Sequence, residues 1–109
     1  METNVNPQPG EIMHVVLIKW RSDAHSDRIT AAVQGLLGLR DKIDGILELT
    51  CGDNFSVRAQ GFQTGLVVRL RDRAALEAYG PHPAHQDVLN KLIVPIREDV
   101  IALDYEVTV

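Results

Sequence analysis

The sequence feature that most constrains the fold is an apolar run of strand length, residues 12–20, rich in β-branched side chains. Such a run predicts a β-strand, in which successive side chains point to opposite faces of the sheet. The residues divide into Ile12, His14, Val16, Ile18 and Trp20 on one face and Met13, Val15 and Leu17 on the other. Both faces therefore need cover. In a chain of 109 residues we expect helices to cover one face and a second copy of the chain to cover the other.

The remaining periodicity predicts a helix, two strands, a broken helix and a final strand. The first helix lies between Ser26, where Ser26 or a neighbour caps it, and Gly45, which supplies a left-handed stop. Gly35 and Gly38 lower its helix propensity and are expected to let it approach the sheet closely. Strands are expected over residues 46–51, 61–71 and 100–107. This order is that of the ferredoxin-like plait (βαββαβ), an α+β fold in which both helices cover one face of a four-stranded antiparallel sheet.

The broken helix is organised around residues 79–85, which read Tyr-Gly-Pro-His-Pro-Ala-His. Proline cannot continue a helix but suits its first turn. The stretch is therefore expected to end a first helix, Asp72–Ala78, which Asp72 caps. It is also expected to begin a second helix, with His82 at its N-terminus and Pro83 just inside. His85 then falls on an inward and otherwise apolar stripe with Val88, Leu89, Leu92 and Ile96. The titratable ring of His85 is the strongest indication of function in the sequence.

Length and composition restrict the function classes. We expect a single domain over residues 12–109 after a flexible, polar N-terminal tail, residues 1–11. The net charge of −4 provides no basic surface for nucleic acid, and no apolar run approaches the roughly 20 residues of a membrane span. A single cysteine, Cys51, excludes an internal disulfide and fits a reducing compartment, so a cytoplasmic location is expected. The sequence has no phosphate-loop spacing, and we expect no cofactor.

The side chains of His85 and Tyr79 suit acid-base chemistry on a carbonyl compound. An imidazole with a pKa near 6.5 can take a proton from the carbon next to a carbonyl, and a tyrosine hydroxyl can donate a hydrogen bond to the enolate oxygen. His14, on the inward face of the first strand, is the expected orienting residue. In the competing interpretation His85 is structural, with its ring bonded to a backbone carbonyl or to the Tyr79 hydroxyl, and His14 is a satisfied core residue.

Further lining of a ligand pocket is expected from Leu36 on the first helix and from Phe62 and Thr64 on the third strand. The first and third strands are neighbours in the ferredoxin-like topology, so Thr64 shares an inner wall with His14. Trp20, at the end of the first strand, is interpreted either as a lid over the pocket or as core packing, and packing is favoured.

Two polar clusters allow other interpretations. His82 occupies a capping position, and with His85 and a nearby carboxylate it could chelate a metal ion. Because a third ligand is not assured, we expect no metal site. Asp104 and Glu106 on the last strand form either a solvated edge or a polar part of a dimer interface, and the solvated edge is favoured.

Several segments taken together resemble the stress-responsive dimeric α/β-barrel (Dabb) domain family. The most specific is His82-Pro83-Ala84-His85, a His-Pro-x-His element that follows a helix ending in tyrosine. The others are residues 14–20, 42–46, 52–56, 61–62, 72–79 and 103–106. The resemblance covers nearly all of residues 13–106, and it implies a ferredoxin-like fold whose sheets pair face to face in a homodimeric barrel.

The resemblance implies less about function. Most members of the family have no assigned reaction, and some are linked to stress tolerance. One plant member is a polyketide cyclase that closes a poly-β-keto chain by aldol condensation; its acting histidine and tyrosine match His85 and Tyr79, and its early-strand pocket histidine matches His14. The pattern departs at Thr64, where many relatives have histidine, and at Leu36, where the cyclase has tyrosine.

Three functions are therefore weighed. The first is binding of a small apolar or carbonyl-containing molecule between the sheet and the helices, with no assigned reaction. The second is a cofactor-free acid-base enzyme of the cyclase or isomerase kind, which requires an accessible cavity that reaches both His85 and Tyr79. The third is a non-catalytic, stress-stable oligomer whose histidines serve packing.

Overall fold

The computed structural model describes residues 6–108, so residues 1–5 of the expected tail and Val109 of the expected domain lie outside the described residues. The elements in chain order are β1 (Ile12–Trp20), α1 (Ser26–Leu37), the 3₁₀ segment η1 (Gly38–Asp41), β2 (Ile46–Asp53), β3 (Thr64–Leu70), α2 (Arg73–Tyr79), α3 (Pro83–Val88), the π-helical segment η2 (Leu89–Ile93) and β4 (Arg97–Glu106). The predicted order of strands and helices is confirmed.

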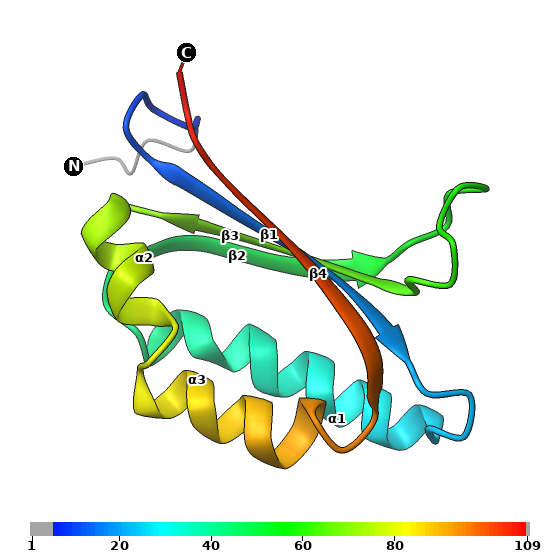
Figure 1. Ribbon diagram of the computed structural model, residues 1–109. Coiled ribbons are helices and arrows are strands. Elements are labelled where there is room, and N and C mark those ends of the chain that lie inside the picture. The colour runs from blue at the N-terminus through cyan, green and yellow to red at the C-terminus, as the bar shows by residue number, and fades with distance from the viewer. Residues whose placement is uncertain (1–5, 109) are drawn as a thin grey trace.

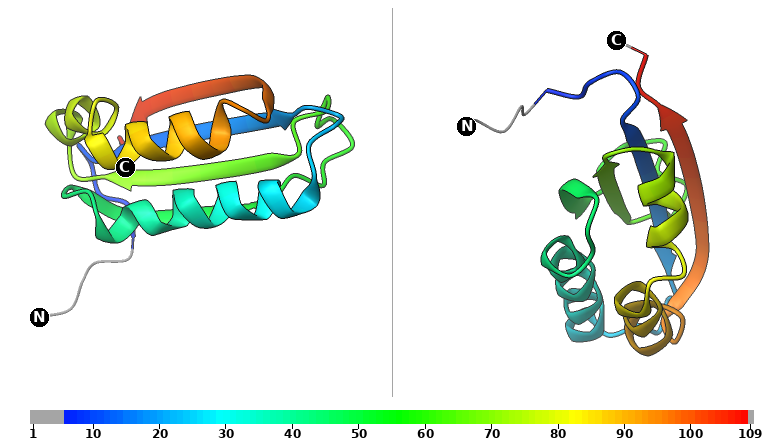
Figure 2. Two further views of the ribbon diagram at one scale, coloured as in Figure 1. Left: turned by 90° about the horizontal axis from the view of Figure 1, so that it is seen from below. Right: turned by 90° about the vertical axis from the view of Figure 1, so that its left-hand side faces the viewer.

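The four strands form one antiparallel sheet in the order β2-β3-β1-β4, so β1 and β3 are neighbours as predicted. Figure 1 shows α1, α3 and α2 on the same side of this sheet, and Figure 2 shows α1 and α3 running side by side across it. Within residues 6–108 the opposite face of the sheet carries no helix. The fold is the expected ferredoxin-like plait. None of the helices in this described part is long and apolar enough to cross a membrane.

The core fills the space between the sheet and the helices. Most inward residues of β1 and β3 are buried together with the inner faces of α1, η1, α2 and η2: Ile12, Ile18, Trp20, Ala32, Leu36, Leu39, Leu66, Val68, Leu70, Ala75, Tyr79 and Ile93. The alternation predicted for the first strand is therefore confirmed for its inward face. One layer of helices packed on one face of a sheet encloses a single hydrophobic core.

The caps of the two short helices are those expected. The Asp72 carboxylate accepts a hydrogen bond from the backbone N–H of Ala75 at 2.8 Å, and Nδ1 of His82 accepts one from the backbone N–H of Ala84 at 3.1 Å, with Pro83 in the first helical position. Such bonds satisfy donors that a helix start leaves free. Of the candidates for the cap of α1, Ser26 or a neighbour, the N-cap is the neighbour His25, and it makes no side-chain hydrogen bond there.

The helix after His85 changes its winding within the predicted inward stripe. Val94 donates its backbone N–H to the carbonyl of Leu89, five residues earlier, at 2.8 Å, and this i to i+5 bond defines a π-turn. The wider turn shifts the inward position by one residue, so Ile93 is buried at 1% exposure while Leu92 is only partly buried. The expectation for Leu92 is corrected accordingly, whereas Val88 and Ile96 are buried as predicted.

Two glycines control how the helices meet their neighbours. Gly45 has the predicted left-handed conformation, with φ +95°, and a Cβ there would lie 2.7 Å from Cβ of Ala75. Its predicted role as the helix stop is wrong, because α1 ends at Leu37, η1 ends at Asp41, and Gly45 lies in the turn before β2. Gly35 faces Leu92, whose Cδ1 lies 2.6 Å from the position of an added Cβ. The close approach at Gly35 is therefore between α1 and the helix containing η2, and not between α1 and the sheet as expected. Gly38 has open space around it.

Three strand boundaries differ from the prediction by two residues or more. β2 continues to Asp53, two residues beyond the expected end. β3 begins at Thr64, because Gln60 and Gly61 adopt positive φ and form a turn before it. β4 begins at Arg97, three residues earlier than expected, and contains a bulge in its pairing with the end of β1.

Candidate functional site

A cavity of about 190 Å³ lies between the helices and the inward side of β1 and β4. We call it the inner cavity. Its lining is His14, Val16, Ile18, Leu36, Leu66, Tyr79, His85, Leu89, Ile93, Arg97, Val100 and Ala102. Most of these side chains are aliphatic, and the polar groups are two histidines, one tyrosine and one arginine. An apolar cavity with a few convergent polar groups is the usual form of a small-molecule site.

The ring of His85 has one nitrogen committed and one available. Its Nδ1 lies 2.8 Å from the carbonyl oxygen of Gly80, and since a carbonyl can only accept, Nδ1–H is the donor. The neutral ring then carries its lone pair on Nε2, which has no hydrogen-bond partner within residues 6–108. Gly80 ends the helix before the Pro-His-Pro turn, so the helix break itself orients the ring.

The environment of His85 favours its neutral form. Burial lowers the pKa of His85 below its ordinary value of 6.5, and the nearby rings of His14 and His82 act in the same direction, against the hydrogen bond to Gly80, which raises it. A buried imidazole loses solvation more heavily when charged. At neutral pH His85 is therefore an unprotonated base.

Tyr79 lies between the two cavity histidines. Its ring centroid is 4.4 Å from that of His85 and 5.5 Å from that of His14. The residue is 2% exposed, and burial raises the pKa of Tyr79 to about 12. Its hydroxyl has no hydrogen-bond partner within residues 6–108. The hydroxyl is therefore a proton donor that the fold leaves available.

His14 is paired with a residue that the sequence does not identify as part of the site. Nδ1 of His14 and Oδ1 of Asp104 form a hydrogen bond and ion-pair contact. The two residues face each other in the β1–β4 pairing. Asp104 is partly exposed, as expected for a strand edge, but it also orients His14 so that Nε2 is the free nitrogen. The signal that could have found Asp104 is the antiparallel register between the first and last strands.

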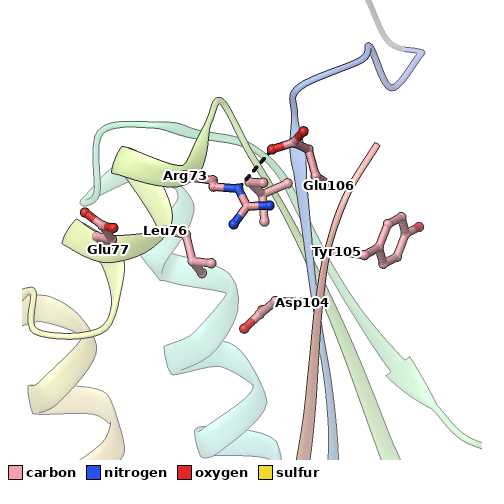
Figure 3. A pocket seen from close by; sticks show the side chains of 7 residues that line it. Arg73, Leu76, Glu77, Asp104, Tyr105 and Glu106 are labelled. Atoms are coloured by element: carbon pink, nitrogen blue, oxygen red, sulfur yellow. Dashed lines mark hydrogen bonds and ion pairs between the residues drawn. The ribbon is translucent and has the colours of Figure 1, made fainter. Parts of the chain in front are cut away.

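A second cavity, of about 170 Å³, lies beyond this pair, between α2 and the end of β4. Figure 3 shows its residues, with Asp104 and Tyr105 on opposite sides of β4 and the Arg73 guanidinium directed at Glu106. The Arg73–Glu106 distance is 2.9 Å. Since Arg73, Glu106 and Asp104 are all engaged in pairs, we place the candidate site in the inner cavity, where Nε2 of His85 and the Tyr79 hydroxyl are free.

The remaining expected site residues fall into two groups. Leu36 lines the inner cavity beside Tyr79 and His85. Trp20, Phe62 and Thr64 are buried but are absent from the described lining of that cavity. Nε1 of Trp20 donates to the Thr64 hydroxyl at 2.9 Å, so each satisfies the other's polar atom. Trp20 packs as favoured, and Thr64 lies opposite Ile18, four positions along β1 from His14.

Neither His82 nor Cys51 takes part in the cavity. His82 is a helix cap, and within residues 6–108 no three side chains of histidine, cysteine, aspartate or glutamate converge as a metal ion would require. Burial raises the pKa of the Cys51 thiol, so the thiol stays protonated and a poor nucleophile.

The fold and the cavity define a class: a small ferredoxin-like domain with a histidine-tyrosine cluster beneath its sheet. The family model described as Stress responsive A/B Barrel Domain (Dabb) matches residues 12–107. The chain belongs to this family.

Two curated relatives, both from Arabidopsis thaliana, are named as stress-response A/B barrel domain-containing proteins. One is 31% identical over 91% of this chain and 38% of its own length. The other is 36% identical over 86% of this chain and 46% of its own length. The chain therefore spans less than half the length of these two relatives.

Solved structures support the same fold. A dimeric ferredoxin-like protein of unknown function from Jannaschia sp. CCS1 is 30% identical, with a TM-score of 0.76 over 90% of this chain and 100% of that chain. Hydroxynitrile lyase from Passiflora edulis is 17% identical, with a TM-score of 0.83 over 93% of this chain and 96% of that chain. Because the identity to the hydroxynitrile lyase is only 17%, this similarity shows the fold alone.

Proposed function

We propose that this chain binds a small, mostly apolar carbonyl compound in the inner cavity and moves a proton on it, with His85 as the base and Tyr79 as the hydrogen-bond donor. The observation that carries the proposal is the bond from Nδ1 of His85 to the Gly80 carbonyl. It commits one ring nitrogen to the backbone and leaves the basic nitrogen, Nε2, next to a tyrosine whose hydroxyl has no partner within residues 6–108.

The same bond appears in the competing interpretation of His85 as a structural residue. A structural role would satisfy the ring, but here only one nitrogen is satisfied. A histidine used for packing alone would not need an uncommitted ring nitrogen that faces a cavity beside a tyrosine hydroxyl with no partner within residues 6–108. Groups whose pKa values are shifted by burial and that converge in a cavity are typical of functional sites.

The size of the inner cavity restricts the ligand. A cavity of about 190 Å³ is close to the roughly 150 Å³ that accommodates benzene in an engineered protein core. The ligand is therefore the size of one ring or a short chain. A long poly-β-keto chain is too large, which together with Leu36 in the wall argues against the cyclase substrate.

The reaction step follows from the positions of the donor and the base. The Tyr79 hydroxyl donates a hydrogen bond to the carbonyl oxygen, Nε2 of His85 takes a proton from the adjacent carbon, and the electrons of that C–H bond form the enolate C=C as negative charge gathers on oxygen. The imidazolium then returns the proton to carbon at the same or another position. No group outside the chain is consumed. His14, held by Asp104, orients the Tyr79 ring from the other side.

A second candidate is cleavage of α-hydroxynitriles, which the Passiflora edulis neighbour suggests by name. Here Nε2 of His85 would take the hydroxyl proton, the C–C bond to the nitrile would break to give the carbonyl, and the leaving cyanide would accept the proton. Fold does not carry activity across at this identity, so α-hydroxynitriles enter the tests as a second ligand class.

We also propose that the chain forms a homodimer through the sheet face opposite the helices. Three apolar side chains of β4 are half exposed on it: Ile101 at 49%, Leu103 at 56% and Tyr105 at 49%. Met13, Val15 and Leu17 of β1 lie beside them, because Met13 pairs with Tyr105, Val15 with Leu103 and Leu17 with Ile101. A contiguous apolar patch of this kind marks an interaction surface, and the Jannaschia neighbour is described as dimeric.

Two ligands of nearly the same shape test the carbonyl site. Acetophenone has a C=O group where α-methylstyrene has C=CH₂. We expect wild type to bind acetophenone about fivefold more tightly in titration calorimetry, since one hydrogen bond contributes about 1 kcal/mol. Tyr79→Phe should remove this difference. Tyr105→Phe, on the outer face of the sheet, is the matched control and should keep it.

Equal binding of the two ligands by wild type would contradict the carbonyl site. Failure of both ligands and of an α-hydroxynitrile to bind would contradict the ligand cavity itself. In that case an assembly larger than a dimer with unusual heat resistance would support the stress-stable oligomer.

A further inference from the structure

We propose that the molecule bound in the inner cavity carries a carboxylate, which Arg97 holds at the end of the cavity away from His85 and Tyr79. The inference rests on the proposed function, and it narrows the ligand class from carbonyl compounds to oxo acids, which have a ketone at one end and a carboxylate at the other.

Arg97 is the only permanently charged side chain in the described lining of the inner cavity. That lining contains no carboxylate, and no side chain within residues 6–108 forms an ion pair or hydrogen bond with the Arg97 guanidinium. Nearby charges are paired elsewhere: Lys19 with Glu98 at 3.1 Å and Arg21 with Asp23 at 3.0 Å. An exposed arginine at the mouth of an apolar cavity, with no protein anion bound to it within residues 6–108, is available to hold the anion of a ligand.

A β-bulge directs Arg97 to this side of the sheet. Ile18 pairs with Val100 and both line the cavity, while Lys19 pairs with Asp99 on the outer face. Regular alternation would next place Glu98 on the cavity side. The register shift between Lys19 and Trp20 instead pairs Trp20 with Arg97. Bulges redirect side chains in this way near functional sites. Here the bulge places Arg97, instead of Glu98, at the cavity wall.

The cavity separates its two polar ends. His14, which contacts Tyr79, and Trp20, which pairs with Arg97, are six residues apart on β1, or about 20 Å between their Cα atoms. The aliphatic side chains of Val16, Ile18 and Val100 line the wall between. A long arginine side chain can reach back over part of that distance. The ligand that matches this arrangement has an apolar middle, a carbonyl at one end and an anion at the other.

A carboxylate is the anion that fits best. The guanidinium presents planar, paired N–H donors that match a carboxylate in a bidentate contact. Arg97 is exposed and also borders a shallow surface depression with Arg21 and Glu98, so the carboxylate can stay in contact with water while the apolar chain enters the cavity. This lowers the cost of desolvating the charge.

The test uses levulinate, its longer straight-chain homologues with a terminal methyl ketone, and the methyl ester of each acid. We expect wild type to bind the best acid of the series about ten- to a hundredfold more tightly than its ester in calorimetry, as charged hydrogen bonds contribute in proteins. Added salt should reduce that ratio. Arg97→Gln should bring it to about one by weakening the acid alone. Arg40→Gln, a change of an exposed arginine outside both cavities, should leave it unchanged.

Two outcomes would overturn the inference. In the first, wild type binds each acid no more tightly than its ester, or the tighter binding of the acid persists in Arg97→Gln. Either result would show that the carboxylate site is wrong, while the carbonyl site would stand. In the second, neither acids nor esters bind wild type, and the proposed function fails together with the inference. Arg97→Lys, which keeps the charge but loses the planar fork, should retain only part of the gain.

Discussion

The two central side chains of the site are held by different forces. Tyr79 is placed by packing, since its ring is buried against His14 and His85 and its hydroxyl has no hydrogen-bond partner within residues 6–108. His85 is placed by a hydrogen bond to Gly80, the residue at which α2 ends. Burial makes the neutral forms of both groups more stable, which keeps the imidazole basic and the phenol protonated at the same pH.

The stability of the protein should depend on pH through His85. Its pKa is lowered by burial in the folded state relative to 6.5 in the unfolded state, so the unfolded chain binds more protons in the window below 6.5. The stabilisation is thus complete above about 6.5 and is lost as the pH falls through the lowered pKa. In urea unfolding across this window, the free energy of unfolding of wild type should rise with pH, and the slope should be smaller in His85→Gln. His25→Gln, a change in an exposed turn, should keep the wild-type slope; equal slopes in wild type and His85→Gln would contradict the shift.

Two substitutions at Tyr79 should separate packing from chemistry. Tyr79→Phe keeps the ring and removes a hydroxyl with no partner within residues 6–108, so we expect less than about 1 kcal/mol of change in the free energy of unfolding. Tyr79→Ala removes a buried ring and should cost about 3–5 kcal/mol. Both values can be measured by urea unfolding. A large loss in Tyr79→Phe would mean that the hydroxyl is structural.

At the scale of elements, sequence patterns predict how helices start and stop better than how they wind. Asp72 and His82 with Pro83 each act through the local backbone, so their roles can be predicted from residue type and position. The π-turn in η2 and the bulge between β1 and β4 have no such local signature, because each inserts one residue to fit the packing of other elements. Their consequences are missed with them: Ile93 replaces Leu92 on the inward stripe, and Arg97 joins the cavity wall.

The site residues also divide into those with a local sequence signature, which could be predicted, and those without one, which could not. His85, Tyr79, His14 and Leu36 come together as expected, because each lies on an inward stripe that can be read from alternation or helical periodicity. Asp104 depends on the register of β4 against β1, which no residue type determines. Thr64 lies on the expected inward face, but its hydroxyl accepts a hydrogen bond from Trp20, and Thr64 is absent from the described lining of the cavity.

Gly45 should be the most sensitive of the glycines that join elements. Its φ of +95° disfavours any side chain, and an added Cβ would lie 2.7 Å from Cβ of Ala75 on α2. We expect Gly45→Ala to lower the free energy of unfolding by about 1–3 kcal/mol. Gly52→Ala, on β2 with open space around it, is the matched control and should be neutral or slightly stabilising. Thermal or urea unfolding of both variants measures these changes. Similar losses in the free energy of unfolding of the two variants would contradict a special role for position 45.

At the scale of the whole molecule, the sheet has one face covered by its own helices and one face that is apolar without cover within residues 6–108. β1 is apolar on both faces because it lies at the centre of this arrangement: its inward side chains line the inner cavity and its outward ones border Ile101, Leu103 and Tyr105. A second copy seated there would leave the inner cavity on the far side of each sheet. The proposed dimer and the proposed site are therefore separable by mutation.

Charges on the open face should dissociate the dimer without emptying the cavity. Leu103→Lys places an ammonium in the apolar patch. We expect this variant to sediment as a monomer and to retain ligand binding, whereas wild type should sediment with twice the chain mass. Val94→Lys, a change of a half-exposed valine on the helix side, should remain dimeric. A Leu103→Lys variant that sediments as wild type would place the interface elsewhere.

The measurement that tests the central claim most directly is exchange of the methyl protons of acetophenone in heavy water, followed by nuclear magnetic resonance. If His85 is a base in the cavity, wild type should accelerate exchange about a hundredfold or more over buffer. The rate should be level at neutral pH and fall as the pH drops through the lowered pKa of His85, and His85→Gln should return it to the buffer rate while remaining folded. A folded His85→Gln variant that exchanges as fast as wild type, or a wild type no faster than buffer, would contradict the assignment of His85 as the base.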